Sequence, residues 1–213
     1  MNFDDFIHQL SKINNLPLPG ETSHFKMAPE LRIKELKSIR AKKENAKKAA
    51  VMALFYPKQD NETHLLLILR KTYQGVHSNQ VGFPGGKVED QDMDLLETAL
   101  RETYEEVGVP VEAVKTVCQL TQVYIPPSNF EVQPYMGYYH MDVPFKIQES
   151  EVETLIEVPL LDFMNDENIV GEKRLTSYAG NISVPAFKLN GYVVWGATAM
   201  MLSEVKDLLK QVL

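Results

Sequence analysis

Apolar residues near the N-terminus recur with the period of an α-helix. In residues 3–13 these positions are Phe3, Phe6, Ile7, Leu10 and Ile13. Their spacing places them on one helix face. We expect this helix to end before the proline-rich turn at 16–20 and to pack on another element. A second helical stretch is predicted for residues 30–48, which carry eight lysine and arginine residues.

Short extended segments follow these helices. Residues 49–56 and 64–70 are mostly apolar and are separated by a turn, so we predict two paired strands in a sheet covered on both faces. Residues 114–124 and 130–140 are predicted to be further strands. Because Pro134 has no amide hydrogen, the strand over 130–140 is expected to lie at a sheet edge or to contain a bulge.

The last part of the chain predicts a hairpin and a closing helix. Asn190-Gly191 is typical of a type I′ turn and joins strands 184–189 and 192–195. The closing helix is amphipathic, and its apolar side consists of Met201, Leu202, Val205, Leu208, Leu209 and Val212. Strands, one central helix, strands and a closing helix predict a fold of the α/β or α+β class, with a mixed sheet between helices.

The central helix is bounded by local signals. Asp94 and Glu97 form a capping box at its start, and Gly108 with Pro110 ends it. Its apolar stripe consists of Leu96, Ala99, Leu100, Thr103 and Val107. We therefore predict a helix over residues 95–107.

Three carboxylates lie close together on this helix. Glu102 and Glu106 are one turn apart, and Glu105 is beside them. Each like-charge pair costs about 0.2–0.5 kcal/mol on a solvated surface unless a cation neutralises it. A hard divalent ion that prefers oxygen ligands, Mg²⁺ or Mn²⁺, suits such a cluster.

A solvated helix face is the alternative explanation. Arg101 would then pair with Glu97 and Glu105 at i,i+4 spacing, each pair contributing only a few tenths of a kcal/mol. Two observations weigh against it: the carboxylates outnumber the single arginine, and Phe83-Pro84-Gly85-Gly86 precedes the helix. Adjacent glycines let the backbone approach a ligand closely, and their carbonyl groups can bind a metal.

These residues resemble the signature of the Nudix hydrolases, which is Gly, five residues, Glu, seven residues, then Arg-Glu-aliphatic-x-Glu-Glu-x-Gly-aliphatic. The matching residues are Gly86, Arg101, Glu102, Glu105, Glu106, Gly108 and Val109. Fourteen residues separate Gly86 from Arg101, where the general pattern has thirteen. Met93 therefore falls at the isolated Glu position, with Asp92 or Asp94 as its substitute. Thr103 replaces the aliphatic residue.

The resemblance implies a Nudix-type α/β/α sandwich and a metal-dependent hydrolase. The implied ligands of Mg²⁺ or Mn²⁺ are Glu102, Glu105, Glu106 and the carbonyl group of Gly86. Arg101 is implied to orient the carboxylates by hydrogen bonding. The general base is either Glu102 or an acid from the loop at 149–153, for which we choose Glu151.

The segment before the helix resembles the coenzyme A pyrophosphatase branch of this family. The matching residues are Leu66, Leu67, Arg70 and Phe83-Pro84-Gly85-Gly86. Residues 75–81 are similar to a His-x-Gly-Gln-Val segment of many members, with Asn79 in place of Gly, and residues 195–199 are similar to the branch's closing segment. The branch cleaves coenzyme A or its thioesters into 3′,5′-ADP and (acyl-)4′-phosphopantetheine.

Substrate contacts are expected from the same region. The candidates are Arg70, Lys71, His77 and Gln80. Tyr124 and Tyr135 either stack on adenine or belong to the core of the sheet. The basic stretch at 30–48 is either a solvated face or, less commonly, a docking surface for substrate phosphate.

Two other functions stay open. Lys71, Gly75 and Asn79 depart from the branch pattern, which is compatible with another nucleoside diphosphate substrate such as ADP-ribose or NADH. A non-catalytic Nudix module that senses a nucleotide fits less well, because such modules typically lose the box carboxylates and Arg101 and all three glutamates are present.

Length, composition and charge narrow the picture further. The chain has 213 residues, of which 44% are hydrophobic, so we expect one Nudix domain over 49–213 with a helical extension over 1–48. A net charge of −7 argues against nucleic acid as a partner.

Cys118 is the single cysteine, so no internal disulfide is possible. The N-terminal residues do not resemble a signal peptide, and no apolar run reaches membrane-spanning length, so we expect a cytoplasmic protein. The N-terminal helices either form a homodimer or cover the sheet.

Overall fold

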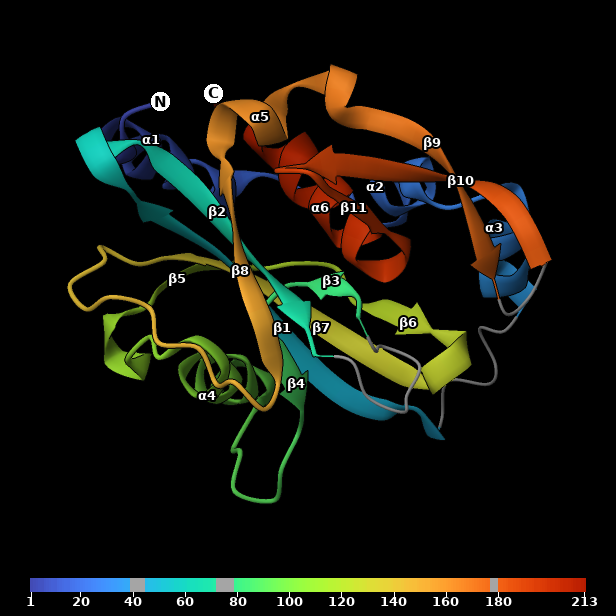
Figure 1. Ribbon diagram of the computed structural model, residues 1–213, viewed down its shortest axis with the longest axis horizontal. Coiled ribbons are helices and arrows are strands. Elements are labelled where there is room, and N and C mark those ends of the chain that lie inside the picture. The colour runs from blue at the N-terminus through green and yellow to red at the C-terminus, as the bar shows by residue number, and fades with distance from the viewer. Residues whose placement is uncertain (39–44, 72–78, 177–179) are drawn as a thin grey trace.

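The computed structural model describes residues 1–38, 45–71, 79–176 and 180–213 as a mixed sheet between helices (Figure 1). Within these residues the main sheet has the order β3-β2-β1-β7-β5, while β4 pairs with β1, β6 with β7 and β8 with β2. Its strands are β1 (Lys47–Pro57), β2 (Thr63–Arg70), β3 (Val81–Gly82), β4 (Gly85–Lys87), β5 (Lys115–Gln119), β6 (Val123–Ile125), β7 (Phe130–Tyr138) and β8 (Val152–Pro159).

A smaller sheet and six α-helices complete the described fold. The second sheet consists of β9 (Ile169–Thr176), β10 (Gly180–Leu189) and β11 (Tyr192–Trp195). The α-helices are α1 (Phe3–Leu10), α2 (Glu21–His24), α3 (Glu30–Ser38), α4 (Leu95–Val107), α5 (Leu160–Met164) and α6 (Gly196–Leu209). Among the described residues, no helix has both the length and the apolar character needed to cross a membrane.

Strand β1 is buried on both faces, which explains its unbroken apolar run. Ala50, Met52, Leu54 and Tyr56 belong to the hydrophobic core that includes α4 residues. The alternate residues Ala49, Val51, Ala53 and Phe55 belong to the core that includes α1 and α6 residues. β1 runs parallel to β7 and antiparallel to β2 and β4. The predicted α/β/α arrangement with a mixed sheet is confirmed.

The N-terminal helix α1 covers one face of the main sheet. Phe3 and Phe6 are buried, and the Phe6 ring centroid lies 4.8 Å from that of Phe55 on β1. The helix is capped by Asn2, whose side chain accepts hydrogen bonds from the amides of Asp4 and Asp5. Of the two predicted roles for this segment, the structure shows the covering one.

The second predicted helix is wrong at its C-terminal end. Helix α3 covers Glu30–Ser38, residues 39–44 lie outside the described ones, and Lys47 and Lys48 begin β1. In β1 these lysines lie next to Phe130 and Glu131 of β7, and Lys48 forms an ion pair with Glu131. Pairing with β7 therefore outweighs the helix propensity of Lys47 and Lys48.

The single strand predicted over 114–124 is also wrong, because two strands replace it. β5 and β6 both pair with β7, and they are separated by residues 120–122. The interruption lies opposite Pro134, which has no amide hydrogen to donate. Instead, the carbonyl group of Pro134 accepts a bond of 2.9 Å from the amide of Leu120. β7 has neighbours on both sides, so of the two alternatives predicted for it the edge position is wrong, whereas its pairing with β5 does contain an irregularity, between Thr116 and Cys118.

The hairpin and the closing helix are present as predicted. Asn190 and Gly191 have φ angles of 48° and 82°, as a type I′ turn requires. Helix α6 differs in one respect, because its polar residues Ser203, Glu204 and Lys206 are buried too. Glu204 and Asp207 of α6 form hydrogen bonds with residues outside the helix (Figure 1). Glu204 accepts from Gly20 before α2 and from Thr121 between β5 and β6, and Asp207 accepts from Ser23 in α2.

Glu204 joins the N-terminal segment to α6 and the main sheet. Its carboxylate is fully buried and accepts hydrogen bonds from the amide of Gly20 (3.1 Å), and from the amide and hydroxyl of Thr121 (3.0 and 2.6 Å). His24 Nε2 lies 3.0 Å from the second oxygen. Burial opposes ionisation, but the hydrogen bonds from His24 and Thr121 outweigh it and lower the pKa of Glu204.

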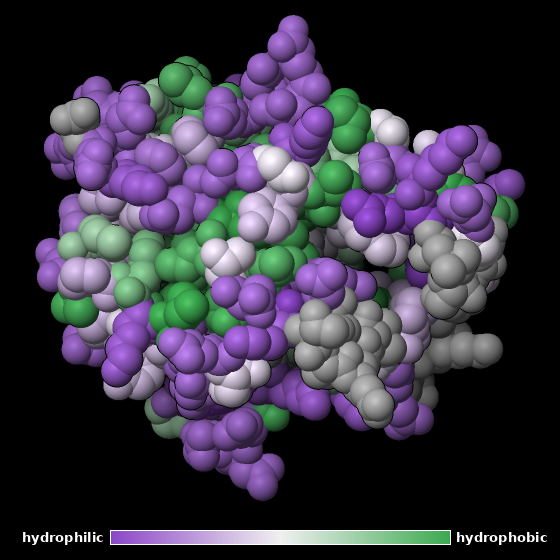
Figure 2. All heavy atoms as spheres, in the orientation of Figure 1, coloured by the Kyte–Doolittle hydropathy of each residue, from purple (hydrophilic) through white to green (hydrophobic). Residues whose placement is uncertain are grey.

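Polar side chains cover much of the front face of the molecule (Figure 2). Apolar side chains gather near the middle of this view, where β8 crosses in front of β2 (Figures 1 and 2). β8 pairs with β2 alone among the described strands, so it forms an edge of the main sheet.

We predict that Glu204→Gln destabilises the fold by at least about 2 kcal/mol at pH 7, because a buried acceptor of several hydrogen bonds loses its charge and gains an amide donor. Since the pKa of Glu204 is lowered on folding, its stabilising contribution is present above pH ~4.3 and is lost as the pH falls through the folded-state pKa. Urea unfolding at several pH values measures this effect.

Glu112→Gln is the matched control, because Glu112 is exposed in a 3₁₀ turn. It should unfold at the parent midpoint. Equal stability of the Glu204 and Glu112 variants at pH 7 would contradict a structural role for the Glu204 network.

Candidate active site

Two glycines place the start of the site against the sheet. Gly85 has a φ angle of 145°, and a Cβ atom on it would lie 2.3 Å from the carbonyl oxygen of Ala50. A Cβ atom on Gly86 would lie 2.3 Å from Oε2 of Glu102. Both contacts are too short for any side chain, so β4 can pair with β1 and receive the Glu102 carboxylate only with glycine at these positions.

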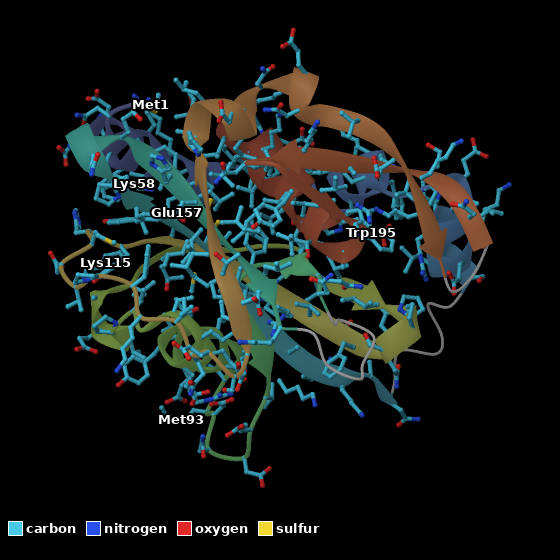
Figure 3. The ribbon with its side chains drawn as sticks, in the orientation of Figure 1. Met1, Lys58, Met93, Lys115, Glu157 and Trp195 are labelled. Carbon is cyan, nitrogen blue, oxygen red and sulfur yellow. The ribbon has the colours of Figure 1, made fainter. Side chains whose placement is uncertain are left out.

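Helix α4 begins and ends as its sequence predicts. The Asp94 carboxylate accepts a hydrogen bond of 2.8 Å from the amide of Glu97, and Gly108 adopts the left-handed conformation at the end. The return bond of the capping box reaches the amide of Met93 at 2.6 Å. Met93 itself is 88% exposed, just before the start of α4 (Figure 3). It therefore takes no part in the carboxylate cluster.

Glu106 is the most buried acid of the cluster. Its side chain is 1% exposed, and one oxygen lies 2.9 Å from Nη1 of Arg70. The other oxygen accepts a hydrogen bond of 2.8 Å from the amide of Gly85. Burial raises the pKa of Glu106 to about 7, although Arg70 and the Gly85 amide oppose this increase. The charges of Glu102 and Glu151 add to it.

Arg101 holds the rest of the cluster together. Its Nε and Nη2 atoms donate to the two oxygens of Asp92 at 2.8 and 2.9 Å. Its Nη1 atom donates to Glu102 at 3.1 Å and to Glu105 at 3.0 Å. The bidentate contact between Arg101 and Asp92 holds the pKa of the Asp92 carboxyl well below its usual range. Of the two predicted substitutes for the isolated Glu, Asp92 contacts Arg101, whereas Asp94 caps the helix.

Glu102 and Glu105 differ in their exposure. The Glu102 side chain is 13% exposed, and burial raises its pKa although Arg101 opposes this. The Glu105 side chain is 51% exposed. The alternative of a solvated face is correct for Glu105 and its ion pair with Arg101, but the burial of Glu102 and Glu106 contradicts it for the other two.

The donors present suit a hard divalent cation in their chemistry. They are carboxylate and main-chain oxygens, and two of the carboxylates have a pKa raised by burial, which a bound cation would offset. Among the described residues, however, no three His, Cys, Asp or Glu side chains are already grouped as metal ligands. Arg70 and Arg101 occupy oxygens of the three glutamates instead. A carboxylate accepts about four hydrogen bonds or ligands, so capacity for a cation remains.

A cavity of about 490 Å³ opens beside this cluster. Arg70, Gly85 and Gly86 form its boundary with the carboxylates. Its remaining walls come from the segment 27–36, β1, β6, β7, the β3–β4 connection, the second sheet and the start of α6. They include Arg32, Leu36, Phe83, Tyr124, Phe130 and Trp195. Figure 3 shows Trp195 between the two sheets. The volume is within the usual range for sites that bind small molecules.

The predicted substrate residues separate into three groups. Arg70 and Gln80 line the cavity. The Lys71 side chain lies 3.6 Å from Glu153, and its amide donates to the carbonyl group of Glu151. His77 lies outside the described residues.

The two predicted general bases and the two predicted stacking tyrosines lie in different parts of the structure. Glu102 lies in the cluster, and Glu151 is exposed but acts electrostatically on Glu106. Tyr124 lines the cavity and donates a hydrogen bond to Asn129 at 2.9 Å. Tyr135 belongs to the core beneath α4, so its stacking on a ligand in this cavity is excluded.

Several cavity residues were not predicted individually. Arg32 lies within the basic stretch, for which a phosphate-docking role was the less common alternative. Lys87 directly follows the glycine pair, and Trp195 is the single tryptophan of the chain. Only the folded arrangement brings these three residues to one cavity, because they are more than fifty residues apart in the sequence.

The family model for the NUDIX domain matches residues 46–174. Two bacterial relatives carry the name "Uncharacterized Nudix hydrolase NudL". The Cronobacter sakazakii protein is 34% identical over 152 residues, which are 68% of this chain and 74% of that protein. The Yersinia enterocolitica protein is 43% identical over 101 residues, which are 47% of this chain and about half, 51%, of that protein.

Solved structures share the fold. A Caenorhabditis elegans Ap4A hydrolase in a binary complex superposes with a TM-score of 0.52 at 15% identity, over 78% of this chain and 98% of that one. A MutT/nudix family protein from Enterococcus faecalis gives a TM-score of 0.53 at 14% identity, over 88% and 72% of the two chains. These superpositions concern the fold alone. The domain match and the relatives show that the chain belongs to the Nudix family and is a Nudix hydrolase, of the enzyme class that acts on phosphoanhydrides.

Proposed function

We propose that the protein hydrolyses the phosphoanhydride of coenzyme A or its thioesters to 3′,5′-ADP and (acyl-)4′-phosphopantetheine. The observation that carries this proposal is the position of the buried Glu102 and Glu106 carboxylates beside Arg70, at one boundary of the 490 Å³ cavity. The upstream segment around Arg70 and Phe83-Pro84-Gly85-Gly86, which resembles the coenzyme A pyrophosphatase branch, supports this choice of substrate.

Glu102, Glu105, Glu106 and the carbonyl group of Gly86 would hold Mg²⁺ or Mn²⁺. A divalent cation there supplies charge neutralisation for the diphosphate and lowers the pKa of a bound water. Arg101 holds Glu102 and Glu105 next to each other through its contacts at 3.1 and 3.0 Å. Arg70 keeps Glu106 in place and presents a guanidinium group to the cavity, where an anionic diphosphate binds.

The general base is a proposal with two candidates. Glu102 lies in the cluster, and burial raises its pKa, which makes it a better proton acceptor than an exposed carboxylate. Glu151 lies at the start of β8, and its charge acts on Glu106. We retain Glu151 as the choice from sequence, because its charge acts on Glu106 and its exposed side chain can release a proton to solvent, whereas Glu102 is paired with Arg101.

Another nucleoside diphosphate derivative, such as ADP-ribose or NADH, is the alternative substrate. A non-catalytic module is disfavoured, because the box residues Arg101, Glu102, Glu105 and Glu106 are all present, Arg101 pairs with Glu102 and Glu105, and Glu102 and Glu106 are largely shielded from solvent. A cytoplasmic location, a homodimer and the division into residues 1–48 and 49–213 stay predictions.

Purified protein should cleave coenzyme A in the presence of Mg²⁺ or Mn²⁺, giving 3′,5′-ADP and 4′-phosphopantetheine by mass spectrometry. The same assay includes acetyl-coenzyme A, ADP-ribose and NADH at equal concentration. A larger kcat/KM for ADP-ribose or NADH than for either coenzyme A substrate would overturn the proposed specificity.

Glu106→Gln should lower kcat by at least about 100-fold, because a charged ligand at the buried position becomes neutral. The amide is nearly the same size, but its NH2 group faces whichever of the Gly85 amide and Arg70 its oxygen does not bind, so we expect the variant to fold with a lowered midpoint of thermal unfolding. Steady-state kinetics and thermal unfolding measure both effects.

Glu97→Gln serves as the control on the same helix, because Gln also caps at this position. This control should retain the parent kcat. A Glu106→Gln variant with parental kcat would remove Glu106 from the mechanism.

Asp92→Asn should lower kcat by about 10-fold or more, because Arg101 loses its charged bidentate partner and no longer fixes Glu102 and Glu105. Asp90→Asn, in the same exposed loop, should leave kcat unchanged. If the Asp92 and Asp90 variants have the same kcat, then Arg101 does not depend on Asp92 for its position.

A further inference from the structure

We propose that Arg32, Lys47 and Lys87 form a second anion subsite, which binds a phosphate monoester of the nucleotide away from the scissile anhydride. This inference rests on the proposed function, because it concerns the same cavity. Its ligand is a nucleoside diphosphate derivative that carries an additional phosphate, such as the 3′-phosphate of coenzyme A.

The two lysines lie on one face of the main sheet. Lys87 on β4 is in register with Ala49 on β1, and Lys47 on β1 is in register with Phe130 on β7. Alternate residues of a strand share a face, so Lys47, Ala49, Lys87 and Phe130 form one surface. Both ammonium groups lie 5.9 Å from the centroid of the Phe130 ring. Ala49, Lys87 and Phe130 also line the cavity.

Helix α3 brings the third cation to the same cavity. The Arg32 side chain is 13% exposed, and its Nη1 atom lies 2.6 Å from Glu35 on the next turn. Arg32 and Leu36 line the cavity wall, together with Met27, Ala28 and Pro29. The segment that carries Arg32 is held to the fold by the buried Glu204, through Gly20 and His24.

The charges at this end of the cavity favour an anion. Within the described part of the chain, no carboxylate forms an ion pair with Lys47 or Lys87, whereas the neighbouring Lys48 pairs with Glu131. Two ammonium groups beside one ring repel each other, and a phosphate monoester of charge about −1.5 to −2 relieves this repulsion. The protein as a whole carries a net charge of −7, so the local cationic group is not a consequence of general composition.

The two ends of the cavity are joined by the short strand β4, whose first residue, Gly85, binds Glu106 through its amide. Lys87 follows the Gly85-Gly86 pair on β4, and two strand residues span about 7 Å. Arg101 donates a hydrogen bond of 2.9 Å to the carbonyl group of Lys87, which fixes this strand relative to the carboxylates. Because Arg70 and Lys87 line the same cavity, a ribose between them would have its 5′-diphosphate near Arg70 and a phosphate on its 3′-oxygen near the lysines. Dephospho-coenzyme A, ADP-ribose and NADH lack that phosphate.

The test compares coenzyme A with dephospho-coenzyme A for Arg32→Gln, Lys87→Met and the double variant. For the double variant we expect the KM for coenzyme A to rise by at least about 10-fold, because charge-assisted contacts to phosphate are lost. The KM for dephospho-coenzyme A should change by less than about 2-fold. Equal effects on both substrates, or no effect on either, would overturn the subsite.

Lys115→Met is the matched control. Lys115 lies on β5, its side chain is exposed, and it does not line the cavity. Figure 3 shows it on the opposite side of the molecule from Trp195. The control should retain both KM values.

A binding measurement separates failure of the subsite from failure of the proposed function. By calorimetry, the parent should bind 3′,5′-ADP more tightly than 5′-AMP, and the double variant should bind the two equally. This preference is measurable without any turnover of coenzyme A. Equal affinity of the parent for both nucleotides would contradict the subsite, whereas a clear preference without coenzyme A hydrolysis would contradict only the proposed substrate.

Discussion

The burial of the Glu106 carboxylate between Arg70 and the amide of Gly85 is the constraint on which the site depends. A carboxylate that is 1% exposed costs several kcal/mol unless its oxygens are hydrogen-bonded, and here both oxygens have a partner. The amide of Gly85 reaches Glu106 only because Gly85 has no side chain, which lets β4 lie against Ala50 of β1. The glycine loop, the strand end at Arg70 and α4 are therefore parts of one electrostatic unit.

The fold supports this unit from both faces of the sheet. Apolar residues of β1 pack alternately toward α4 and toward α1 and α6. β1, the strand with which β4 pairs, is therefore packed on both faces. The cavity lies on the α6 side and uses the N-terminal segment as a wall. Glu204 connects that segment to α6 and to Thr121, so the cavity depends on residues from both ends and the middle of the chain.

Local signals were sufficient for the parts of the structure that are determined locally. Asp94, Glu97 and Gly108 define α4 through contacts within the helix and its caps, and Asn190-Gly191 defines its turn through backbone conformation alone. The glutamates of α4 were found for the same reason, because their spacing within one helix fixes their proximity. Their individual burial was not predictable, since it depends on β4 and Arg70.

Nonlocal pairing explains the errors. The break between β5 and β6 lies opposite Pro134 on the neighbouring strand, and the helical composition of Lys47 and Lys48 yields to pairing with β7. Likewise, Asp92 was distinguished from Asp94 only by its contact with Arg101. Arg32 and Trp195 have no sequence pattern that assigns them to one cavity, because their proximity depends on how α3 and the second sheet pack.

The most direct test of the central claim is a calorimetric titration with Mn²⁺ at pH 6 and pH 8, in two buffers with different ionisation enthalpies. Because the pKa of Glu106 is about 7 without metal, we predict that Mn²⁺ binds more tightly at pH 8 and displaces more protons at pH 6. Glu106→Gln should remove this dependence on pH. No uptake of Mn²⁺, or binding with the same affinity and no proton release at both pH values, would contradict the assignment of the buried carboxylates as the metal site.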